Sequence, residues 1–256
     1  MQPTSFATQR PYLFATLLIV AIIVVYLAAG TAAGLLQLLP IHLYLIANVA
    51  LAILAAALLT RLRFWNESGF RRLAAPRDLL LYWLPFSVVL VNLAFGIRSM
   101  SWGQAAFYLI LAALIGFAEE VLFRGLILRA VAPRGLWKAA LVSSLLFGLA
   151  HSLNVLGGAD QLYTLLQIGY SLAIGFGFAA VTLRTRTLWP LIIIHALIDF
   201  TSFLASHGAS PAGITTLDMV ISAAFIVAFI GYGIYLLTRV RPRVDQAGGA
   251  LAGLHA

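Results

Sequence analysis

Two adjacent glutamates, Glu119 and Glu120, lie inside a long apolar run, and Arg124 follows four residues after the second. A charge at the centre of a bilayer costs at least about 2.5–3.5 kcal/mol, so a cluster of charges there predicts a functional site. Residues four apart share a helix face, and a glutamate that precedes a basic residue favours an ion pair between Glu120 and Arg124. Adjacent helical residues point about 100° apart. Glu119 is therefore expected to face elsewhere, as the carboxylate that is free for chemistry.

Further ionisable residues stand in later apolar runs, namely His151, His195 and Asp199. His195 and Asp199 are four residues apart, which predicts one polar helix face. Phe147 precedes His151 by the same spacing, and Asn154 follows the histidine by nearly one turn. We expect Phe147 and Asn154 to have structural roles that hold the histidine's helix in place.

The four candidate catalytic residues are expected at similar depths in the membrane. At about 1.5 Å of rise per residue, Glu119 lies roughly 15 Å from the boundary at Arg129, and the other three lie roughly 13–20 Å from their nearest basic boundary. These depths fall near the middle of a hydrocarbon core about 30 Å thick. A carboxylate and two histidines around a buried, water-accessible pocket can activate water for attack on a carbonyl, while a second polar pair stabilises the oxyanion. The reaction class would be peptide hydrolysis inside the membrane.

The composition is that of an integral membrane protein. Hydrophobic residues make up 62% of the 256 residues and charged residues only 9%, and the mean hydropathy is +1.01, whereas soluble domains carry about 25% charged residues. The apolar runs are long and continuous, as spanning helices require, and not short and alternating as in a barrel. We predict an all-α, polytopic membrane helix bundle with about eight transmembrane helices, near residues 12–36, 40–59, 79–97, 102–128, 137–153, 162–183, 187–205 and 217–238.

The distribution of basic residues predicts the orientation of the bundle. All but two of the 16 basic residues fall on one side of the predicted membrane; Arg98 lies on the other side, and Arg124 belongs to the glutamate motif. The positive-inside rule then places both termini in the cytoplasm. The bias toward Ala, Leu and Arg with almost no Lys is typical of a GC-rich bacterium, so we expect the inner (cytoplasmic) membrane. The basic residues form no patch with interleaved aromatics, and nucleic acid is not expected as a partner.

The chain divides into three parts by these patterns: residues 1–78 with two helices and a basic loop, 79–205 with the ionisable residues, and 206–256 with a final helix and a short basic tail that we expect to be disordered. The longest cytoplasmic connection, residues 61–77, fits an interfacial helix or a plain loop equally well. The absence of cysteine excludes thiolate catalysis and cysteine-based metal sites.

Three ordered motifs stand on successive hydrophobic segments: Glu119-Glu120-x-x-x-Arg124, Phe147-x-x-x-His151 and His195-x-x-x-Asp199. In this order and context they resemble the CAAX protease and bacteriocin-processing family (CPBP, or Abi family) of intramembrane endopeptidases. The resemblance covers roughly residues 79–204, about half of the chain. It implies that Glu119 and His151 activate the attacking water, and that His195 and the residue at position 199 bind the oxyanion.

The resemblance leaves the role of Asp199 and the need for a metal open. Eukaryotic prenyl-protein proteases of this family carry Asn where this chain has Asp199. An ionised aspartate would repel an oxyanion, so Asp199 must be protonated, orient His195 or bind a metal. Zinc is the alternative cofactor, with the ligand set Glu119, His151, His195 and Asp199. No His-Glu-x-x-His motif is present, and because water activation by glutamate needs no metal, we favour hydrolysis without a cofactor.

Two other classes of function stay open at this point. A transporter or channel could use the same residues as a proton or cation path, but the sequence lacks the paired broken helices in two related halves that this would favour. A non-catalytic scaffold or immunity protein would keep the fold and bind another membrane protein. For an enzyme, the expected partners are the lipid bilayer and a membrane protein or peptide as substrate. The sequence does not identify that substrate or the oligomeric state.

Overall fold

The computed structural model describes residues 6–206 and 214–239, and every regular element in these ranges is helical. Eight helical segments are long and apolar enough to cross a membrane, as predicted. The fourth continues to Arg134, beyond the predicted end at residue 128. In order the helices are α1 (Phe6–Gln9), α2 (Pro11–Leu35), α3 (Pro40–Leu62), η1 (Pro76–Tyr82), α4 (Trp83–Ala94), α5 (Trp102–Glu119), the π-helix η2 (Glu120–Ile127), α6 (Leu128–Val131), η3 (Ala132–Arg134), α7 (Leu136–Ala150), η4 (His151–Gly157), α8 (Gln161–Thr185), α9 (Trp189–Ser206) and α10 (Thr216–Arg239).

Local sequence signals set the starts of these helices. Pro11 and Pro40 occupy the first turns of α2 and α3, where the missing N–H costs no hydrogen bond. Ser101 caps α5: its Oγ accepts from the Gln104 N–H at 3.2 Å, and Gln104 Oε1 accepts from the Ser101 N–H at 3.0 Å. Such a capping box satisfies two groups that a helix start otherwise leaves unpaired.

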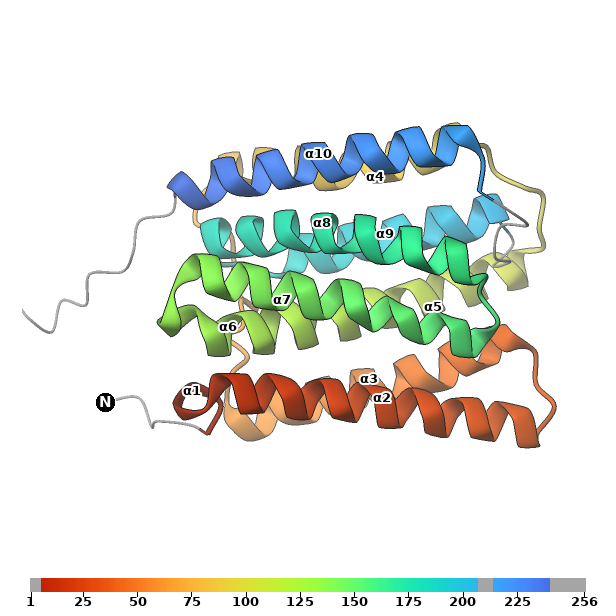
Figure 1. Cartoon of the computed structure of the whole chain (residues 1–256), viewed down its shortest axis with the longest axis horizontal. Coiled ribbons are helices and arrows are strands. Elements are labelled where there is room, and N and C mark those ends of the chain that lie inside the picture. The colour runs from red at the N-terminus through yellow and green to blue at the C-terminus, as the bar shows by residue number, and fades with distance from the viewer. Residues whose placement is uncertain (1–5, 207–213, 240–256) are drawn as a thin grey trace, which may run out of the picture.

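The spans pack as a bundle in which the α2–α3 hairpin forms one side, and α4 with α10 forms the opposite side (Figure 1). Between them, α5 packs against α9, and α7 packs against α8. The α5–α9 contact is close because Gly116 has no side chain: a Cβ there would come within 2.9 Å of the backbone of Ile192 and Ala196. This contact lies one turn before Glu119, so it brings the glutamates next to α9.

Residues 64–75, which we call the 64–75 segment, form turns and no interfacial helix, so of the two alternatives the loop is the one observed, with Ser68 and Gly69 buried within it. The buried Ser68 hydroxyl donates to the Gly125 carbonyl at 2.8 Å, and the Leu188 N–H donates to the Gly69 carbonyl at 2.9 Å. Phe70 packs edge-on against Trp65 and Trp189, each with 4.9 Å between ring centroids. These contacts join the α3–η1 connection to η2 and to the start of α9.

The two described ends of the chain, at Phe6 and Arg239, lie at the same end of the bundle (Figure 1). We call this the basic end, because the described loops and helix termini there carry almost all of the basic residues outside the glutamate motif: Arg10, Arg61, Arg63, Arg71, Arg72, Arg77, Arg129, Arg134, Lys138, Arg184, Arg186 and Arg239. That the basic end faces the cytoplasm stays a prediction. The expected disordered tail lies outside the described residues.

Candidate active site

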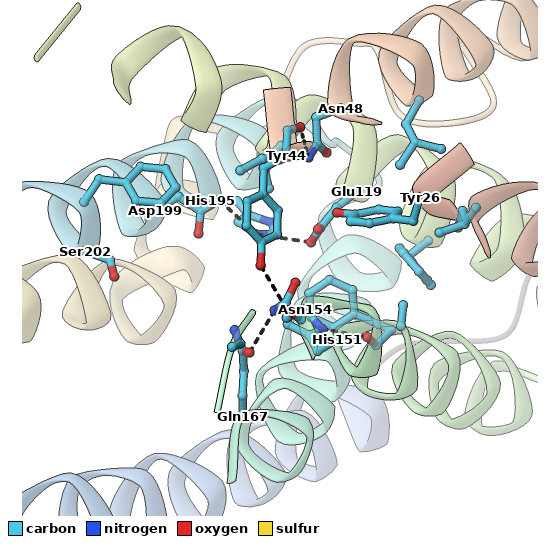
Figure 2. A pocket seen from close by; sticks show the side chains of 18 of the residues that line it. Tyr26, Tyr44, Asn48, Glu119, His151, Asn154, Gln167, His195, Asp199 and Ser202 are labelled. Atoms are coloured by element: carbon cyan, nitrogen blue, oxygen red, sulfur yellow. Dashed lines mark hydrogen bonds and ion pairs between the residues drawn. The ribbon is translucent and has the colours of Figure 1, made fainter. Parts of the chain in front are cut away.

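A cavity of about 200 Å³ inside the bundle is lined by all four predicted catalytic residues, Glu119, His151, His195 and Asp199. They come from α5, from η4 at the end of α7, and from α9. Figure 2 shows their side chains converging on one space, with neutral polar groups from α3 and α8 around them. The prediction that these residues can meet is therefore confirmed, and their depth in the membrane stays a prediction.

The predicted ion pair between Glu120 and Arg124 is confirmed, with Arg124 Nη1 2.9 Å from Glu120 Oε1 and both side chains fully buried. The guanidinium also lies over the ring of Phe147, 4.0 Å from its centroid, and faces Phe178 at 5.4 Å. One carboxylate and two aromatic faces thus compensate a charge that is buried from water, in an arrangement that is costly to disturb.

Glu120 also has a second partner that the sequence interpretation missed. His195 Nδ1 lies 2.7 Å from Glu120 Oε1, and His195 Nε2 lies 3.6 Å from Glu119 Oε2. Glu119 faces the cavity and Glu120 the buried Arg124, as the spacing predicted, but both carboxylates also approach the same imidazole, at opposite nitrogens. Glu120 fixes the orientation of the ring, and Glu119 lies on its cavity side.

The helix type changes at these two residues. The chain passes from α5 to the π-helix η2 between Glu119 and Glu120, although the backbone angles of both glutamates are those of an α-helix. Short π-helical stretches are frequent at functional sites. The two carboxylates differ in exposure. The Glu119 side chain has 19% of its surface exposed, whereas the Glu120 side chain is fully buried.

Asp199 completes the surroundings of His195, with its Oδ2 3.7 Å from His195 Nε2. This contact spans one turn of α9, as the four-residue spacing predicted. The Asp199 side chain keeps 24% of its surface exposed. Neither Asp199 Oδ2 nor Glu119 Oε2 has a hydrogen-bond partner among the described residues. Two carboxylate oxygens thus lie near one imidazole nitrogen at the cavity wall.

His151 is held from behind, with its Nδ1 2.9 Å from the Phe147 carbonyl oxygen. A carbonyl can only accept, so Nδ1 carries the proton and the neutral ring offers Nε2 as an acceptor. Phe147 also packs against the His151 ring at 4.8 Å between centroids, which agrees with its predicted structural role. Asn154 lies beyond the histidine and donates to Gln167 Oε1 at 2.8 Å, so it links η4 to α8.

The cavity wall contains residues that sequence reasoning missed. Tyr26 of α2 and Tyr44 and Asn48 of α3 line it beside Glu119 (Figure 2). The Tyr44 hydroxyl donates to the Asn154 carbonyl at 3.2 Å, and Asn48 Nδ2 donates to the Tyr44 carbonyl at 2.9 Å. Asn48, an amide in the middle of a predicted span, was a usable signal, because polar groups in such helices face the bundle interior.

The zinc alternative concerns the donor groups around the cavity. Within the described ranges, no group of three or more His, Cys, Asp or Glu side chains is placed so that it could hold a metal ion. His195 and His151 each engage Nδ1, with Glu120 and with a backbone carbonyl, and leave Nε2 toward the cavity. We derive no step through a metal, and hydrolysis without a cofactor stays a prediction.

Taken together, eight apolar helices and a buried cavity of carboxylates and imidazoles define a polytopic membrane protein with a hydrolase-like site. Residues 100–201 match the family model described as type II CAAX prenyl endopeptidase Rce1-like. This match supports the CAAX protease family that the motifs of the chain indicate. The match covers less than half of the chain and contains every residue of the three motifs. No curated protein matches the chain.

Proposed function

We propose that the protein is an intramembrane endopeptidase that hydrolyses a peptide bond of a membrane-associated protein or peptide, with water activated by Glu119 and His151. The observation that carries this proposal is the convergence of Glu119, His151 and His195 on one cavity in the middle layer of the bundle. The match of residues 100–201 to an endopeptidase family model supports the reaction class.

In the proposed reaction, the Glu119 carboxylate takes a proton from water while His151 Nε2 accepts the other hydrogen and orients the molecule. The water oxygen then bonds to the carbonyl carbon of the substrate, and negative charge moves to the carbonyl oxygen. His195 carries both ring protons in this step: Nδ1–H donates to Glu120, and Nε2–H, on the cavity side, donates to this oxyanion. When the tetrahedral intermediate collapses, the C–N bond breaks and the proton passes from Glu119 to the leaving amine, which gives a free carboxylate and an amine.

For Asp199 we propose a positioning role through His195. Its Oδ2 and Glu119 Oε2 lie 3.7 and 3.6 Å from His195 Nε2. These separations are longer than direct hydrogen bonds and suit a bridging water. Asp199 would then keep the imidazole in its working orientation before the substrate binds, and it would not contact the oxyanion itself.

The test of the proposal compares the membrane proteomes of cells that carry wild-type protein and the Glu119→Gln variant. An uncut precursor should accumulate in the Glu119→Gln cells and should disappear when wild-type protein is restored. Glu67→Gln is the matched control, because Glu67 is an exposed carboxylate in the 64–75 segment. Identical proteomes at equal levels of folded protein would contradict hydrolysis and favour a scaffold.

Metal removal gives a separate prediction about the mechanism. Because the proposed base is a carboxylate, we expect cleavage of the precursor by purified protein to continue after exhaustive chelation, with no zinc found by elemental analysis. Loss of cleavage on chelation, followed by recovery when zinc is added back, would contradict the metal-independent mechanism. It would leave the assignment as an endopeptidase intact.

A further inference from the structure

Three arginines from distant parts of the chain meet at the basic end of the bundle. Arg129 belongs to α6, Arg186 directly follows α8, and Arg71 belongs to the 64–75 segment. The Arg71 Nε–H donates to the Arg186 carbonyl at 2.7 Å, and the Thr187 hydroxyl donates to the Arg71 carbonyl at 2.8 Å. The charges of Arg71 and Arg186 both act on the Arg129 guanidinium. The fold therefore holds three like charges together.

Backbone contacts fix the position of this cluster. Gly125 precedes Arg129 by four residues in the same span, and its carbonyl accepts from the buried Ser68 hydroxyl at 2.8 Å. Gly69, the next residue, lies against Arg186: a Cβ on Gly69 would come within 3.2 Å of the Arg186 carbonyl oxygen. Two consecutive residues of the 64–75 segment thus contact both the span that carries Arg129 and the residue Arg186.

Arg129 lacks the compensation that a buried charge needs. Its Nε and Nη2 atoms are buried and have no hydrogen-bond partner among the described residues. Within the same ranges, neither Arg129 nor Arg186 forms an ion pair. Arg124 differs, because its buried guanidinium has Glu120 and the face of Phe147. An uncompensated charge is costly to bury, and like charges beside it add to that cost. An anion is the partner that would remove both costs.

We propose that Arg71, Arg129 and Arg186 form a binding site for a phosphate group, with Arg129 as the buried member. Guanidinium groups pair with phosphate oxygens through two parallel N–H···O bonds. Anionic lipid headgroups and free phosphate share this chemistry, and basic pockets beside membrane helices bind such headgroups. None of the three arginines lines the active-site cavity, so the inference does not depend on the proposed hydrolysis.

Thermal unfolding of the delipidated full chain in neutral detergent tests the proposal, since a ligand that binds the native state raises the Tm. One arm titrates inorganic phosphate against chloride at equal ionic strength. The other adds phosphatidylglycerol or, as its control, phosphatidylcholine to the micelles. Arg129→Gln removes the buried member of the cluster, and Arg186→Gln removes an exposed one. Arg184→Gln is the matched control, because Arg184 is exposed two residues before Arg186.

We expect wild-type protein and Arg184→Gln to gain Tm with the phosphate group. The apparent Kd should rise about tenfold or more in Arg129→Gln and Arg186→Gln, as loss of a hydrogen bond to a charged group predicts. If Arg129→Gln does not fold, the comparison of Arg186→Gln with Arg184→Gln decides alone.

The two arms identify the source of the phosphate group. A site-dependent gain with phosphatidylglycerol alone supports a lipid headgroup as the ligand, and a site-dependent gain with inorganic phosphate supports free phosphate. No gain beyond that given by chloride and phosphatidylcholine would overturn the proposal. An equal gain in wild-type protein and all three variants would also overturn it, because the anion would then bind elsewhere.

Discussion

The two walls of the cavity are built from different chemistry. On the α5–α9 side, which we call the charged wall, Glu120 joins Arg124 and His195 at 2.9 and 2.7 Å, and the ion pair is fully buried. We call the α2–α3 side the neutral wall. There the Tyr44 hydroxyl donates to the Asn154 carbonyl at 3.2 Å, and Asn48 donates to the Tyr44 carbonyl within the same helix. The charged wall holds reacting groups in fixed positions, while the neutral wall shapes the space that a substrate occupies.

The two walls come from different parts of the sequence. The charged wall lies within the residues that match the endopeptidase family, 100–201, and the neutral wall lies before them. Reaction chemistry thus belongs to the shared segment, while residues outside it line much of the remaining cavity. If this division is right, substitutions in the charged wall should cost far more than those in the neutral wall.

The largest effect on stability is expected for Arg124→Met. Removing the guanidinium leaves the Glu120 carboxylate buried with only His195 to compensate its charge, and breaking a buried pair in this way costs about 3–5 kcal/mol. Unfolding of the purified protein in mixed micelles, followed by tryptophan fluorescence, measures the change. The double variant Glu120→Gln with Arg124→Met removes both charges and should be less destabilised than the single variant. Equal stability of Arg124→Met and wild type would show that the charged wall is not held by this pair.

A smaller loss is expected for Gly116→Ala, which adds a methyl group against the α9 backbone at 2.9 Å. Overpacking of this kind costs about 1–3 kcal/mol, and it should also lower turnover because it moves α5 away from His195. Gly169→Ala is the matched control, since no atom lies within 4 Å of the added Cβ. That variant should be unchanged or up to about 1 kcal/mol more stable, because alanine favours helix. Indistinguishable behaviour of the two variants would contradict the close α5–α9 contact.

The smallest effect is expected in the neutral wall. Tyr44→Phe removes one partly buried hydrogen bond, to the Asn154 carbonyl, which is worth about 0.5–1.5 kcal/mol. Cleavage should continue with a similar kcat. Any change in cleavage should be a change in KM. A loss of stability as large as that of Arg124→Met would remove the distinction between the walls.

The sequence predicted what depends on length, hydropathy and spacing. Eight spans follow from apolar runs, and the Glu120–Arg124 pair follows from a four-residue separation. The contact between Glu120 and His195 could not be predicted, because it joins residues 75 positions apart on two helices whose relative packing no spacing determines. Tyr26 was missed for a different reason: neutral polar side chains occur in many spans, and only the fold shows which of them reach a cavity.

The measurement that tests the central claim most directly is the rate of precursor cleavage by purified Glu119→Gln and Glu120→Gln proteins, with their stabilities measured in parallel. Loss of the base at Glu119 should lower the rate by about 10²–10⁴-fold. The free energy of unfolding should stay unchanged, because Glu119 has no buried ion-pair partner as close as that of Glu120. Glu120→Gln should reduce stability and misplace His195. Full activity of a well-folded Glu119→Gln protein, with activity lost only in Glu120→Gln, would contradict the assignment of Glu119 as the base.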